Sequence, residues 1–139
     1  MLDFELRESF IKALLVTKSW RDCLEFFEPS PFVESPSPLT HRDVISKAFD
    51  ENEAEIGWSV MQKMINVDQT PPPKVYQAYL RYCHRHKDDL KGNLERMFHF
   101  LQDNQLYITQ NVANELAKLL TDFKRSHKFA EITDEFVSF

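Results

Sequence analysis

The sequence has 139 residues, of which 42% are hydrophobic and 28% charged, a composition typical of one folded domain. Only two glycines are present, which excludes Gly-rich phosphate loops, dinucleotide-binding fingerprints and hairpin-rich β folds. Two cysteines, Cys23 and Cys83, are too few for a disulfide scaffold and fit a reducing compartment. The net charge of −5 indicates no general affinity for nucleic acid. No apolar run is long enough to cross a membrane, and residues 1–7 resemble neither a signal nor a transit peptide.

Taken in chain order, the apolar spacing predicts helical hairpins separated by prolines. A first hairpin, with a turn at Lys18-Ser19, ends at the cluster Pro29, Pro31, Pro36 and Pro38. A second, with a turn at residues 50–53, ends at the prolines of 71–73. A third turns at 87–89 and a fourth at 125–127. Each predicts two short amphipathic helices, and no stretch alternates with period two for long enough to indicate a strand.

Four windows, starting at Phe4, Pro38, Pro73 and Gln110, repeat one pattern. Their positions seven, eight and eleven are all apolar: Phe10, Ile11, Leu14, Val44, Ile45, Ala48, Tyr79, Leu80, Cys83, Leu116, Ala117 and Leu120. A period near 35 with two helices per repeat indicates an α-solenoid, because one hairpin cannot bury both of its faces. We therefore predict an all-α domain over 1–139, built from about four helical hairpins at 4–37, 38–72, 73–109 and 110–139.

This pattern resembles the pentatricopeptide repeat, a relative of the 34-residue tetratricopeptide repeat. The resemblance rests on the 35-residue period, the opening at residues 75–80 and the second helix at 57–64. It covers residues 4–139 and implies a right-handed superhelix. In this family a small residue allows close helix packing, and Gly57 occupies that position in this sequence. Family members act mostly in mitochondria or plastids, which implies a mitochondrial location here, with the cytoplasm as the alternative.

The resemblance also implies a binding mode, because most family members bind single-stranded RNA along a groove lined by the first helices. One base per repeat is read by a first-helix side chain and by the last residue before the next repeat. Carried onto this sequence, the first-helix readers are Glu8, Arg42, Gln77 and Asn114. Their partners are Ser37, Pro72 and Thr109.

Position nine of each window lies one helical turn beyond the reader position, on the same face. It holds Lys12, Ser46, Arg81 and Lys118. With Arg42, these cations predict a basic stripe that contacts phosphates without reading the sequence. The alternative is that they are ordinary solvated residues of helix faces.

We expect no catalytic or metal site. Residues 83–86 (Cys-His-Arg-His) lack a second Cys/His cluster to complete a zinc site. His127, Asp122 and Ser126 are neighbours in a turn, without a nucleophile elbow. Pairs of carboxylates in the turns are expected to cap helices rather than hold Mg²⁺. Some organellar ribonuclease P proteins combine these repeats with a nuclease domain, for which 139 residues leave no room.

The expected function is therefore a non-catalytic single-stranded RNA-binding module of organellar RNA metabolism or translation, with no cofactor and no membrane association. Its predicted contacts are Lys12, Arg42, Gln77, Arg81, Thr109, Asn114 and Lys118. The alternative is a scaffold that binds a protein through the concave face or its apolar ends, which the net charge of −5 favours. Short solenoids need polar caps or neighbours. The apolar tail at 134–139 therefore predicts further repeats or a protein partner at the chain ends.

Overall fold

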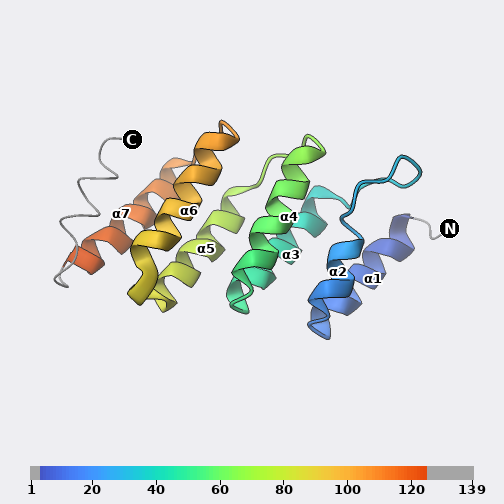
Figure 1. Cartoon of the computed structure of the whole chain (residues 1–139), viewed down its shortest axis with the longest axis horizontal. Coiled ribbons are helices and arrows are strands. Elements are labelled where there is room, and N and C mark those ends of the chain that lie inside the picture. The colour runs from blue at the N-terminus through green and yellow to red at the C-terminus, as the bar shows by residue number, and fades with distance from the viewer. Residues whose placement is uncertain (1–3, 125–139) are drawn as a thin grey trace. The chain divides into compact units, whose positions relative to one another are not determined.

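A computed structural model describes residues 4–124, and every regular element in that range is helical (Figure 1). In chain order these are α1 (Phe4–Val16), α2 (Trp20–Glu25), α3 (Pro38–Asp50), α4 (Ala54–Asn66), α5 (Pro73–Arg85), the 3₁₀ helix η1 (Lys87–Asp89), α6 (Leu90–Asp103) and α7 (Gln110–Lys124). The predicted all-α fold of consecutive helical hairpins is confirmed. Across the described range, no helix combines the length and apolar character needed to span a bilayer.

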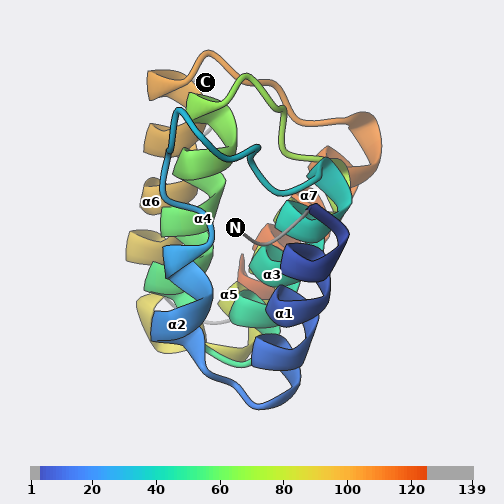
Figure 2. The ribbon, with the colours of Figure 1, turned by 90° about the vertical axis from the view of Figure 1, so that its right-hand side faces the viewer.

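The chain divides into two compact units, residues 1–79 (unit 1) and 80–139 (unit 2). Within unit 1, α1 and α3 form one layer and α2 and α4 the other (Figure 2). The start of α3 follows from local chemistry, because Pro38 is pre-organised for a first helical position and lacks the N–H that would go unpaired there. Ser37 is its N-cap, and the Ser37 Oγ accepts the N–H of Thr40 at 3.2 Å.

Four helices end on a left-handed residue that is not glycine. Lys18, Asn52, Asp68 and Gln105 have φ of 57°, 64°, 63° and 53°, and each lies two residues after a helix. The next N–H then bonds back to a carbonyl five residues earlier, as in Glu53 N to Ala48 O at 2.7 Å and Leu106 N to Leu101 O at 2.8 Å. These Schellman ends satisfy helix-terminal carbonyls, so two glycines suffice for a chain with this many turns.

The core of unit 1 is an aromatic cluster at the α3–α4 packing. The ring centroids of Phe49, Trp58 and Tyr79 lie 4.6–5.5 Å apart in edge-to-face arrangements. A Cβ on Gly57 would lie 2.4 Å from the nearest ring atom of Phe49. The close approach of α4 to α3 therefore needs the small residue that the family resemblance implies.

The connection from α2 to α3 is fixed at both ends. The Arg7 guanidinium donates to the backbone carbonyls of Phe26 and Glu34, and Lys63 on α4 pairs with Glu28 at 2.8 Å. Between these anchors Phe32 is 81% exposed. Residues 26–37 thus form a loop with anchored ends and an exposed aromatic residue.

Not every predicted core position is buried. Among the apolar positions of the repeat pattern, Phe10 is 46% exposed and Ala117 is also exposed. In α7 the buried residues are Val112, Leu116 and Leu119, a stripe rotated away from Ala117. In α1 the side chain of Phe10 is left partly uncovered by the described helices. The predicted turn at 125–127 and the apolar tail lie outside the described residues.

Candidate nucleic-acid interface

Helix α5 has one buried and one cationic face. Its sequence contains no Asp or Glu. Lys74, Arg81, His84 and Arg85 are exposed, and Gln77 is half-buried among them. The spacing of three to four residues places them along one line of the helix. The opposite face consists of the buried residues Val75, Tyr76, Ala78, Tyr79, Leu80 and Cys83.

Helix α7 carries a related polar stripe, beside which lie the exposed carboxylates Glu115 and Asp122. Asn111, Asn114, Lys118 and Thr121 are exposed at the same window positions as Lys74, Gln77, Arg81 and His84 in α5. Asn111 and Thr121 are not among the contacts predicted above, although they occupy window positions two and twelve of the fourth repeat. The Oδ1 of Asn114 accepts a hydrogen bond from the Nε2 of Gln110 at 2.9 Å. Thr109 is exposed, and its Oγ1 accepts the N–H of Val112 at 3.3 Å, so this hydroxyl caps α7.

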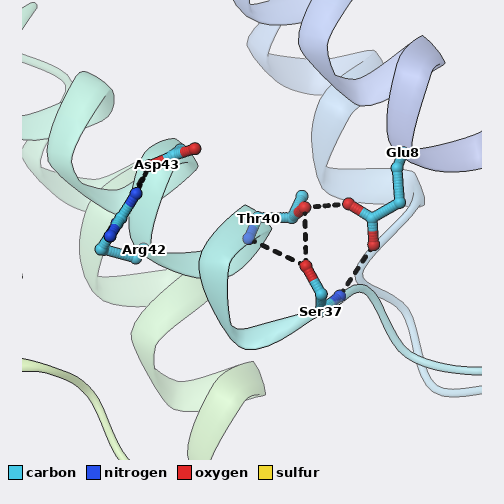
Figure 3. Close-up of polar contacts among 5 residues, drawn as sticks. All are labelled: Glu8, Ser37, Thr40, Arg42 and Asp43. Carbon is cyan, nitrogen blue, oxygen red and sulfur yellow. Dashed lines mark hydrogen bonds and ion pairs between the residues drawn. The ribbon is translucent and has the colours of Figure 1, made fainter.

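In α1 the predicted base-reading residue, Glu8, makes hydrogen bonds within the fold. The Glu8 carboxylate accepts the N–H of Ser37 at 2.8 Å and the hydroxyl of Thr40 (Figure 3). Ser37 Oγ in turn donates to Thr40 Oγ1 at 3.0 Å. Glu8 and Ser37, the predicted base-reading pair of the first repeat, are thus bonded to each other and fix α1 to the start of α3.

The remaining predicted contacts of unit 1 differ in accessibility. The Arg42 guanidinium donates through Nε and Nη2 to the Oδ1 of its neighbour Asp43, at 3.1 and 2.9 Å (Figure 3). A phosphate would have to compete with that carboxylate. The Oγ of Ser46 is buried without a hydrogen-bond partner, so it offers no surface group. Lys12 is exposed.

Charge is distributed unevenly along the chain. Residues 4–72 contain seven Lys and Arg against twelve Asp and Glu, whereas residues 73–124 contain eight against six. The negative net charge of the sequence therefore belongs to its first half. A local excess of cations over residues 73–124 is the condition that phosphate binding by an acidic chain requires.

The buried cysteines and the histidines after Cys83 lie in different surroundings. Burial raises the pKa of the Cys23 thiol to about 11 and that of the Tyr76 hydroxyl to about 12, so both stay neutral at physiological pH. Cys83 is buried while His84 is exposed, and the two therefore point to different surroundings. Within residues 4–124 no three His, Cys, Asp or Glu side chains cluster in a way that could hold a metal ion.

A comparison with known proteins finds one with a similar sequence. A 107-residue stretch is 25% identical to the mitochondrial ribonuclease P catalytic subunit of Rattus norvegicus. The stretch covers 76% of this chain but only 18% of that protein. No family model and no solved structure matches the sequence.

Proposed function

We propose that this chain is a non-catalytic module that binds single-stranded RNA in organellar RNA processing. The observation that carries the proposal is the face of α5, where Lys74, Arg81 and Arg85 are exposed on a helix without a carboxylate. Such a face attracts phosphates without needing to read bases. The similarity to a mitochondrial ribonuclease P subunit supports this RNA-related, mitochondrial role.

We further propose that the contacts lie on α5 and α7. Arg81 and Lys118 supply charge for phosphates, and Gln77 and Asn114 supply amides within reach of bases. The first repeat makes no base contact, because Glu8 and Ser37 bond to each other. RNA recognition by this chain is therefore weakly sequence-dependent, since three of the seven expected reader residues are unsuited to reading a base. Glu8 and Ser37 are bonded within the fold, and Pro72 has no side-chain donor.

The test is fluorescence anisotropy with a labelled single-stranded RNA of mixed sequence at low salt. We expect the double variant Arg81→Gln/Lys118→Gln to bind about tenfold more weakly than the unchanged chain, because two phosphate contacts are lost. The matched variant Lys12→Gln/Arg42→Gln removes the same charge from unit 1 and should change the affinity less than about twofold. Equal losses in both variants would contradict the placement on α5 and α7.

Labelled RNA incubated with the chain and Mg²⁺ should stay intact, and cleavage that persists after repurification would overturn the non-catalytic role.

The second candidate is a protein-interaction scaffold, favoured by the acidic excess of residues 4–72. The same anisotropy titration distinguishes the two candidates. If the chain is only a protein scaffold, the folded chain should not bind the labelled RNA even at low salt.

A further inference from the structure

The large exposed apolar side chains of the described residues come mostly from the first part of the sequence of unit 1. Seven large hydrophobic residues in the described range are exposed, and six of them lie between residues 4 and 39: Phe4, Leu6, Phe10, Val16, Phe32 and Leu39. Single exposed hydrophobic residues are ordinary, but a concentration on one surface marks an interaction site. The helix that contributes most of them is α1.

Helix α1 is apolar on two sides. One side holds Ile11, which is 1% exposed. The other carries an exposed stripe of Leu6, Phe10 and Ala13, which Thr17 continues just after the helix, at intervals of four, three and four residues. The Phe10 ring stacks on Phe26 at 6.4 Å, which extends the stripe to the end of α2. Figure 2 shows α1 and α2 at the front of unit 1.

Comparison of equivalent positions indicates that a helix belongs on this face. Phe10 is at window position seven, where α3 has Val44 and α5 has Tyr79. Phe10 is 46% exposed, whereas Val44 and Tyr79 are 0% and 1% exposed, because neighbouring helices cover that position. A helix on the α1 stripe would continue the packing that α1 already makes with α3 on its other side.

The stripe is complementary to itself. Because its spacing reads the same in both directions, two antiparallel copies related by a two-fold axis bring large side chains against small ones. Leu6 then lies opposite Thr17 of the second copy. Phe10 lies opposite Ala13, so that a ring fills the space beside a methyl group. The same arrangement brings Glu5, in the first turn, near Lys18, just after the last turn, whose ammonium group also pairs with Glu51 at 2.9 Å.

RNA is a poor occupant for this face. Residues 4–37 contain six Asp and Glu against four Lys and Arg. Of these four cations, Arg7 donates to backbone carbonyls and Lys18 pairs with Glu51 at 2.9 Å. Phosphates would therefore meet net repulsion at this end of unit 1.

We propose that the α1 stripe is a homodimer interface, in which α1 packs antiparallel on α1 of a second copy of this chain. Stable interfaces bury about 1,200–2,000 Å² in total, more than one pair of 13-residue helices supplies. The dimer is therefore weak, with a dissociation constant in the micromolar range, about 10–100 µM.

Sedimentation equilibrium of the whole chain, from about 5 µM to 1 mM, tests this. The unchanged chain should show a monomer–dimer equilibrium. Ala13→Arg should raise the dissociation constant at least about tenfold, because a long charged side chain replaces the methyl group that faces Phe10. Ala13 is exposed, so this variant keeps the fold, which thermal unfolding verifies. Phe10→Asp should have the same effect.

The matched control is Phe32→Asp, which places the same charge on an exposed aromatic position of the α2–α3 loop. It should leave the dimer intact. A chain that stays monomeric at the highest concentration would overturn the proposal and leave the stripe to a helix of another protein. A dimer that persists in Ala13→Arg would overturn it as well, because the contact would then lie elsewhere.

Discussion

At the scale of single residues, Gly57 determines how closely α4 approaches α3. Any side chain at this position meets the buried ring of Phe49, which is itself held by Trp58 and Tyr79. We expect Gly57→Ala to lower the free energy of unfolding by about 1–3 kcal/mol, because the packed ring cannot move aside without loss. Urea unfolding followed by tryptophan fluorescence measures this.

Gly92 is the matched control. A Cβ there would approach only the carboxylate tip of Asp89, at 2.7 Å, and this tip can rotate away. Gly92→Ala should therefore leave the stability within about 0.5 kcal/mol or raise it by up to about 1 kcal/mol, since alanine favours a helix. Equal losses for the two variants would contradict the role of the Phe49 contact, because helix propensity alone favours alanine at both positions.

His41 makes the stability of unit 1 depend on pH. It is 1% exposed, its Nδ1 lies 3.0 Å from the Ser37 carbonyl oxygen, and the Phe27 ring packs edge-on at 4.8 Å. Burial lowers the pKa of His41 below its ordinary 6.5, against smaller raising effects of the Ser37 carbonyl and Glu8. In acid the unfolded chain therefore takes up a proton on this ring before the native chain does.

The free energy of unfolding should consequently fall as the pH drops from about 7 to 5.5, by up to about 1 kcal/mol from this group alone. In His41→Asn this part of the pH dependence should disappear. His84→Asn, at an exposed position of α5, should retain it. Parallel pH profiles for the unchanged chain and His41→Asn would contradict the assignment.

At the scale of elements, Glu8 joins α1 to the start of α3. Its carboxylate is half-buried and accepts from both Ser37 and Thr40. Glu8→Ala should lower the free energy of unfolding by about 2 kcal/mol, because two charge-assisted hydrogen bonds are lost and the Ser37 N–H loses its partner. Glu5→Ala, one turn earlier and exposed, should cost less than about 0.5 kcal/mol.

The same variants test whether Glu8 reads RNA. Under conditions where both chains are folded, Glu8→Ala should bind single-stranded RNA as tightly as Glu5→Ala. A selective loss in Glu8→Ala would restore the base-reading role that the family resemblance implied for this position.

The helices were predictable from local signals, and the network at Glu8 was not. Proline at residues 38 and 73 marks the first residues of α3 and α5, and period-3.6 spacing identifies the buried face of α4. The exposure of Phe10 depends on which helix covers α1, and the bond from Ser37 to Glu8 joins residues 29 apart. Neither can be read from spacing within one window. The left-handed helix ends at Lys18 and Gln105 were also unforeseen, because their residue types do not favour that conformation.

At the scale of the whole molecule, charge and apolar surface are distributed differently along the chain. The cationic excess lies in residues 73–124 and the exposed apolar stripe in α1. If RNA binds to α5 and α7 and a second protein chain binds to α1, as we propose, the two functions expected from the sequence need not exclude each other. We therefore expect charge changes on α5 to act on RNA affinity and changes on α1 to act on self-association.

The most direct test of the RNA-binding proposal is the salt dependence of RNA affinity. Four exposed cations on α5 and α7, Lys74, Arg81, Arg85 and Lys118, should give a slope of log K against log salt of about −3 for single-stranded RNA. In Arg81→Gln/Lys118→Gln the slope should weaken to about −1.4. A slope that is unchanged in this variant, or near zero in the unchanged chain, would contradict phosphate binding by these helices.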